Sequence, residues 1–142
     1  SEWDAALAAL RGALARDPRN KDVHQMLGVA YAAKGRHAEA VDSFLRCLEL
    51  PPHANDRVPR FELASAYLRL GKSSQAAEHL ERVLETDPDD ASAWYNLGVA
   101  RDRGGDPAGA EAAWRRSLEL DPSSTLARDV LEGRGRAAPI RR

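Results

Sequence analysis

The sequence has little cysteine, almost no excess charge and no long hydrophobic run, and each shortage excludes a class of protein. Cys47 is the single cysteine among 142 residues, so the chain cannot form an internal disulfide. The net charge is −1, whereas nucleic-acid surfaces need clustered excess Lys and Arg, so we expect no nucleic-acid partner. No apolar run approaches the roughly 20 residues that cross a bilayer, and no signal peptide is visible. The sequence therefore predicts no membrane insertion and favours a cytoplasmic location.

The sequence also lacks the residue patterns of catalytic and metal sites. His24, His37, His53 and His79 show no metal-ligand spacing, and one cysteine does not complete a zinc site. No strand pattern precedes a glycine-rich loop, which excludes the usual phosphate-binding arrangement. We therefore expect no enzyme activity, no catalytic residue, no metal and no cofactor.

The chain does contain a regular repeat. Apolar residues make up 43% of it and charged residues 30%, a balance that favours a folded domain over a disordered chain. Two sets of residues recur at intervals of 34, 36 and 34, namely Pro18, Pro52, Pro88 and Pro122, and Ala6, Ala40, Ala76 and Ala110. A fixed period of this length marks an array of stacked supersecondary units. The two extra residues fall within 51–59, where they either lengthen a loop or change the local pitch of the stack.

Each period is predicted to contain two helices. In one copy, residues 61–70 have apolar residues at helical spacing, Gly71 interrupts the pattern, and residues 73–85 resume it. Pro88 then ends the second helix, because proline cannot continue a helix and disfavours helical backbone in the residue before it. Small residues share one position in the three copies, Gly28, Ala64 and Gly98, which predicts close helix contacts there.

The repeat has the signature of a known family. The last copy contains Trp94, Leu97, Gly98, Ala110, Trp114 and Pro122. This copy resembles the 34-residue tetratricopeptide repeat, and the resemblance stays in phase over nearly the whole chain. It implies an all-α fold, a right-handed α-solenoid of helix–turn–helix units. The expected divisions are the second helix of a truncated repeat (1–20), three repeats (21–56, 57–90 and 91–124), a capping helix (125–133) and a disordered basic tail (134–142). The truncated first unit predicts that the chain is part of a longer array.

In this family the first helices of the repeats line a concave groove that holds peptides or a partner's helix. The resemblance places Phe61 and Tyr95 in that groove, since they are 34 residues apart and occupy the same phase. The full set of candidate groove residues is Gln25, Val29, Phe61, Ser65, Leu68, Arg69, Tyr95, Asn96, Val99 and Arg103. The chaperone-binding members of the family need a carboxylate clamp, of which only Asn96 offers a suitable side chain, so we do not expect a chaperone ligand.

The leading functional hypothesis is a non-catalytic interaction scaffold that binds a peptide or helix of a partner protein. One alternative is a regulatory or targeting segment of a larger bacterial signalling enzyme. Another is a self-assembling module, because Trp3, Leu7, Leu10 and Leu14 form an apolar stripe on a helix that lacks its usual partner. Such exposed stripes mark interaction sites.

Overall fold

The protein is a chain of helices. The computed structural model describes residues 1–133 and 135–141, and in this part of the chain it contains eight α-helices and no strand. They are α1 (Glu2–Arg16), α2 (Lys21–Ala33), α3 (His37–Glu49), α4 (Arg57–Arg69), α5 (Ser73–Thr86), α6 (Ala91–Arg103), α7 (Pro107–Leu120) and α8 (Thr125–Leu131). The predicted seven full helices and short eighth are confirmed. None of these helices is both long and apolar enough to span a membrane.

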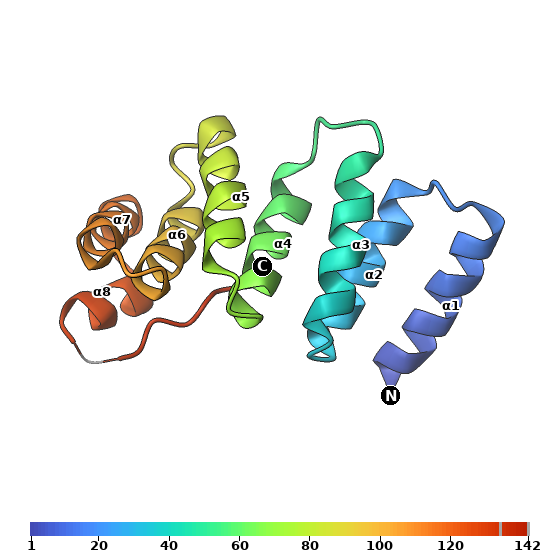
Figure 1. The fold of residues 1–142 in the computed structure, drawn as a ribbon, viewed down its shortest axis with the longest axis horizontal. Helices are drawn as coiled ribbons and strands as arrows, with labels where there is room; N and C mark the ends of the chain where they lie inside the picture. The colour runs from blue at the N-terminus through green and yellow to red at the C-terminus, as the bar shows by residue number, and fades with distance from the viewer. Residues whose placement is uncertain (134, 142) are drawn as a thin grey trace.

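Successive helices pack against one another to form a row that runs from α1 at one end to α7 and α8 at the other (Figure 1). Within the row α4 also contacts both α2 and α6, which are two places away from it in sequence. These three first helices of the repeats therefore form a continuous inner layer. The second helices, α3, α5 and α7, form the outer layer, and the all-α solenoid predicted from the sequence is confirmed.

The ends of the helices repeat with the same period as the sequence. Asn20 and Asp90 cap the first helices of two repeats, and each side chain accepts a hydrogen bond from a backbone N–H three residues ahead. The turn between the first and second helix contains Gly35, Gly71 or Gly105, with φ angles of 72°, 73° and 87°. Glycine recurs there because this left-handed backbone is strained for other residues.

The small residues predicted to lie at close helix contacts do so at Gly28 and Gly98. A Cβ atom added to Gly98 would lie 2.3 Å from Nε1 of Trp114, and one added to Gly28 would lie 2.6 Å from the ring of Phe44. The Trp114 indole also donates a hydrogen bond to the carbonyl of Tyr95 at 3.1 Å. The aromatic ring of the second helix thus occupies the space that a side chain on the first helix would need.

The apolar stripe of α1 is less exposed than the sequence analysis expected. Leu7 is 3% exposed and packs with the buried residues of α2, while Leu10 and Leu14 are half-buried against the same cluster. Trp3 is 43% exposed. The stripe was expected to lack its usual partner, the first helix of the truncated unit. The first helix of the next repeat, α2, covers Leu7, Leu10 and Leu14, so the available apolar surface of α1 is reduced mainly to Trp3.

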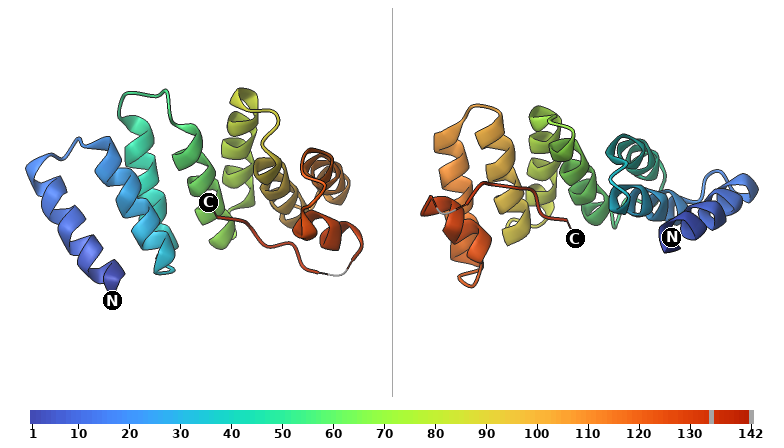
Figure 2. Two further views of the ribbon diagram at one scale, coloured as in Figure 1. Left: turned by 180° about the vertical axis from the view of Figure 1, so that it is seen from behind. Right: turned by 90° about the horizontal axis from the view of Figure 1, so that it is seen from below.

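The segment after α8 differs from the disordered tail that the sequence analysis expected. Residues 135–141 run back from α8 across α6 and end beside α4 (Figure 2). Pro139 is buried in this arrangement and Ile140 is half-buried. Residues 134 and 142 of the predicted tail lie outside the described residues. For 135–141, the inner layer offers hydrogen-bond donors to the backbone, and these bonds hold the segment without helical periodicity.

The packing of α4 against α5 places a histidine in a partly buried site. The ring of His79 stacks on Tyr67, with 5.8 Å between the ring centroids and 16° between the planes. A guanidinium nitrogen of Arg60 lies 3.3 Å from Nδ1 of His79. Burial, and secondly the charge of Arg60, lower the pKa of His79 below its ordinary value of 6.5. The folded protein therefore favours the neutral imidazole.

The close helix contact at Gly98 predicts a stability difference between two glycine substitutions. Gly98→Ala should lower the free energy of unfolding by about 1–3 kcal/mol, because the added methyl group overlaps the Trp114 indole. Gly12→Ala is the control, since its added Cβ meets nothing within 4 Å and alanine is the better helix former. Urea denaturation measures both. Equal stability of Gly98→Ala and the parent protein would contradict the proposed contact.

The lowered pKa of His79 predicts a loss of stability in mild acid. Below about pH 6.5 the unfolded chain takes up a proton on this histidine while the folded protein resists it, so the free energy of unfolding should fall as the pH decreases from 7.5 to 5.5. His79→Gln cannot titrate and should lose less stability over the same interval. Urea denaturation of both proteins at the two pH values tests this, and an identical pH dependence would refute the assignment to His79.

Candidate functional site

Five of the predicted groove residues come together on the inner layer, beneath the segment 135–141. Ser65 and Arg69 lie on α4, and Tyr95, Asn96 and Arg103 lie on α6. All five interact with the backbone of residues 137–140. We call this surface the α4–α6 groove. Its members on α4 and α6 are 26 to 38 residues apart, and the repeat, with its period of 34, brings them together by placing the two first helices side by side.

Asn96 is the centre of the groove and is fully buried. Its Oδ1 accepts a hydrogen bond from the backbone N–H of Ile140 at 2.7 Å, and its Nδ2 donates to the carbonyl of the same residue at 2.9 Å. One amide side chain thus satisfies both backbone groups of one residue, which a carboxamide can do because it is both donor and acceptor. The second proton of Nδ2 points to Ser65 Oγ at 3.2 Å. This arrangement recognises extended backbone whatever its side chain.

Ser65 has two possible acceptors for its one hydroxyl proton. The carbonyl of Ile140 is 2.7 Å from its Oγ, and the carbonyl of Phe61, one turn earlier in α4, is 3.2 Å away. The shorter distance favours Ile140 while the segment is in place. The Phe61 carbonyl remains available when it is not, so the hydroxyl has a partner in both states.

Two arginines extend the same backbone recognition along the groove. Arg69 donates from Nη2 to the carbonyl of Pro139 at 3.3 Å, and Arg103 donates from Nη2 to the carbonyl of Ala137 at 3.4 Å. Arg103 also donates from Nη1 to the carbonyl of Leu68 at 2.8 Å. This second bond holds the guanidinium against the end of α4, so that its other nitrogen is already directed at the groove.

Tyr95 lies between these polar groups, with only 1% of its surface exposed. Its hydroxyl group interacts with the backbone of Ala138. Burial raises the pKa of Tyr95 above 10, although the contact with Ala138 and the charge of Arg103 oppose the shift. The phenol therefore stays neutral near neutral pH and serves as a polar contact at the edge of a buried ring.

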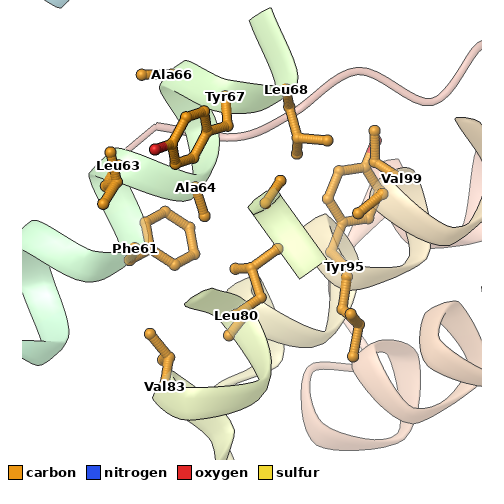
Figure 3. Packing of buried hydrophobic residues seen from close by; sticks show 14 of the residues in the cluster. Phe61, Leu63, Ala64, Ala66, Tyr67, Leu68, Leu80, Val83, Tyr95 and Val99 are labelled. Atoms are coloured by element: carbon orange, nitrogen blue, oxygen red, sulfur yellow. The ribbon is translucent and has the colours of Figure 1, made fainter. Parts of the chain in front are cut away.

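The remaining candidates have different surroundings. Phe61 is fully buried, and Figure 3 shows its ring in the packed core near Leu80 of α5, so it has no free surface to offer a partner. Leu68 and Val99 are also buried, close to Tyr95, and form part of the base of the groove (Figure 3). The expectation that Phe61 is an exposed anchor is therefore wrong for this structure.

Gln25 and Val29 lie on α2, one repeat further along the inner layer. Gln25 is half-buried and Val29 is 36% exposed. Neither is among the groups that hold the segment 135–141, and both remain accessible on the same inner layer. They extend the surface on which a ligand longer than this segment could lie.

Sequence reasoning missed the segment that occupies the groove. The residues Ala137, Ala138, Pro139 and Ile140 form an apolar run inside an otherwise basic stretch. That run was the available signal, but it carries no periodicity to assign it to a surface. Within 1–133 and 135–141, no three His, Cys, Asp or Glu side chains gather in a way that could hold a metal ion.

The architecture is that of an α-helical repeat solenoid, and comparison with known proteins assigns its family. The model of the tetratricopeptide repeat matches residues 1–55 and 61–125. The chain belongs to the tetratricopeptide repeat family.

Curated relatives share parts of their length with this chain. A TPR repeat-containing protein of Pseudomonas aeruginosa is 48% identical over 59 residues, which are 42% of this chain and 56% of that protein. An FK506-binding protein-like protein of Mus musculus is 30% identical over 141 residues, covering 92% of this chain and 40% of the relative. The chain thus spans little more than half of the length of such relatives, or less.

Solved structures show the same solenoid. MamA from Desulfovibrio magneticus RS-1 superposes with a TM-score of 0.87 at 25% identity, covering 93% of this chain and 73% of that one. The first TPR of Spaghetti (RPAP3), bound to an HSP90 peptide, superposes with a TM-score of 0.74 at 26% identity, covering 82% and 91%. The fold is therefore shared with proteins of different biological settings.

Proposed function

We propose that the chain is a protein-interaction module whose α4–α6 groove binds an extended peptide segment of a partner protein. The observation that carries the proposal is the pairing of Asn96 with both backbone groups of Ile140. A partner helix does not fit this pairing, because a helix uses its backbone N–H and carbonyl groups internally. Of the two ligand types considered from the sequence, the geometry favours the extended peptide.

The groove is suited to a peptide because its donors are already in position. Asn96 and Ser65 are buried, and Arg103 is fixed by its bond to the end of α4. Side chains that are ordered before binding lose little conformational entropy when the ligand arrives. Main-chain hydrogen bonds supply affinity in such a site, and the pockets for alternate side chains supply specificity.

The structural neighbours are consistent with this proposal. The first TPR of Spaghetti (RPAP3) is bound to an HSP90 peptide, and it has the same fold over 82% of this chain. The carboxylate clamp expected of chaperone-binding members is not matched by the residues of this chain, so we propose a different peptide as the ligand. The absence of a chaperone ligand stays a prediction.

A second role is compatible with the same groove. Protein O-mannosyl-transferase TMTC1 of Mus musculus is 26% identical over 120 residues, and the chain covers 13% of its length. An array of this kind can therefore be a small part of a much larger enzyme. If this chain is such a part, the groove serves as its targeting or regulatory site. Self-association through α1 is less favoured, since Leu7 is buried against α2.

Peptide selection tests the proposed function. We expect a displayed library of seven-residue peptides, selected on protein that carries Ile140→Pro so that residues 137–140 no longer pair with Asn96, to yield ligands whose binding is at least about tenfold weaker when Asn96→Asp is added. The substitution keeps the size of the side chain but replaces the N–H donor by a carboxylate, which faces a peptide carbonyl. Loss of a buried hydrogen-bond partner costs about 1–3 kcal/mol, and about 1.4 kcal/mol is a factor of ten. Isothermal titration calorimetry measures the affinities.

The matched control is Gln75→Glu, which makes the same chemical change at an exposed position of the outer helix α5. It should bind the selected peptides as the parent does, and circular dichroism should show full helix content for both variants. A library that yields no ligand would refute the proposal. So would peptides that bind the Ile140→Pro protein equally well with and without Asn96→Asp.

A further inference from the structure

The segment 137–140 has the contacts that a bound peptide would have. The groove bonds the carbonyls of Ala137, Pro139 and Ile140 and the N–H of Ile140. Each of these contacts is to the main chain of the segment. A separate peptide of the same conformation can therefore replace it bond for bond, and the two cannot be present together.

The burial of the segment's side chains indicates which residues the groove accepts. Pro139 is buried and Ala138 is exposed, so a charged side chain at the proline position would lose its hydration, whereas the preceding position is unrestricted. Ile140 packs against the main core cluster and borders a hollow of about 260 Å³ between the start of α6, α7 and α8.

Proline also prepares the segment for binding. Its ring fixes φ near −65°, which favours extended backbone, and its lack of an N–H leaves no donor to satisfy at a buried position. The main-chain donor that the groove does need, the N–H paired with Asn96 Oδ1, comes from the next residue, Ile140. A proline therefore suits the buried position, and a following residue with a free N–H and an aliphatic side chain suits the position that pairs with Asn96.

The charges of the segment fit the groove poorly. Arg136 and Arg141 flank the apolar run, and the groove contributes Arg69 and Arg103. Arg141 and Arg69 both lie close enough to His37 to contribute to the lowering of its pKa, after burial as the main cause. Like charges near one another oppose binding, whereas an acidic residue at the position of Arg141 would attract Arg69.

We propose that residues 137–140 are a built-in competitor for the groove, and that the partner is an extended segment with a proline followed by an aliphatic and then an acidic residue. The inference rests on the proposed function. A tethered segment acts at an effective concentration that for short linkers reaches the millimolar range, so even weak contacts hold the groove closed to weak ligands. A partner with an acidic residue at the position of Arg141 is attracted by Arg69, whereas Arg141 is repelled by it, so such a partner displaces the segment.

The test uses a labelled peptide and two substitutions at Ile140. The probe is acetyl-Gly-Arg-Ala-Ala-Pro-Ile-Glu-amide, and fluorescence anisotropy measures its affinity. Ile140→Pro removes the N–H that Asn96 accepts and should release the segment, so this variant should bind the probe at least tenfold more tightly than the parent. Ile140→Val keeps the N–H and should bind the probe as the parent does. Equal affinity for Ile140→Pro and the parent would overturn the competition.

Variant probes test the predicted chemistry of the partner on the Ile140→Pro protein. A probe with N-methylisoleucine in place of isoleucine, and one with aspartate in place of proline, should each bind at least tenfold more weakly. A probe ending in arginine instead of glutamate should bind more weakly at low salt, with the difference shrinking at high salt. If all four probes bind alike, the proposed specificity is wrong.

A second measurement examines the segment directly. In ¹⁵N relaxation experiments on the parent protein, the amide of Ile140 should be as rigid as the helices, and it should become mobile in Asn96→Asp. A mobile Ile140 amide in the parent protein would overturn the competitor. If library peptides bind through Asn96 with the same affinity in Ile140→Pro and in the parent protein, the competitor proposal is wrong and the proposed peptide-binding function stands. If no peptide binds any variant, both the peptide-binding function and the built-in competitor are wrong.

Discussion

The close contact between the two helices of each repeat determines the geometry on which the groove depends. At Gly98 and Gly28 the first helix has no side chain, and an aromatic ring of the second helix fills the space. In these two repeats the outer helix is thereby held close against the inner one. Because α4 then meets both α2 and α6, equivalent positions on successive first helices lie side by side. Ser65 of α4 and Asn96 of α6, which are 31 residues apart, come within hydrogen-bond distance across the contact between these two helices.

The sequence predicted the fold nearly completely because the fold is periodic. Each repeat contacts mainly its neighbours, so a pattern visible within 34 residues contains most of the information on packing. The same phase assigned Ser65, Arg69, Asn96 and Arg103 to one surface, and in the structure all four contact the segment 137–140. It did not predict burial. Phe61 and Tyr95 share one phase, and both rings are buried in the structure. Periodicity alone cannot tell an exposed ring from a covered one.

The segment 135–141 could not be predicted in the same way. Its hydrogen bonds join residues that are 34 to 75 positions apart in sequence, and they involve its backbone, which every residue type provides. A peptide held through its main chain in an extended form leaves no hydrophobic period to detect. The apolar run with a proline showed only that this part of the tail differs in composition from its basic surroundings.

The hydrogen bonds of the groove also determine the free-energy cost of the proposed exchange of its own segment for a partner peptide. Buried polar groups that lose their partners destabilise a protein, so a groove that closes tightly is usually costly to open. Here three polar side chains of the groove each keep one hydrogen bond within the groove when the segment leaves. Ser65 can return to the carbonyl of Phe61, Asn96 keeps its contact with Ser65, and Arg103 keeps the carbonyl of Leu68. Water needs to replace only the hydrogen bonds that these side chains make to the backbone of the segment. The exchange of the segment for a partner peptide therefore leaves the two helices of the groove unchanged, and the outcome depends on the difference between two peptides of similar backbone.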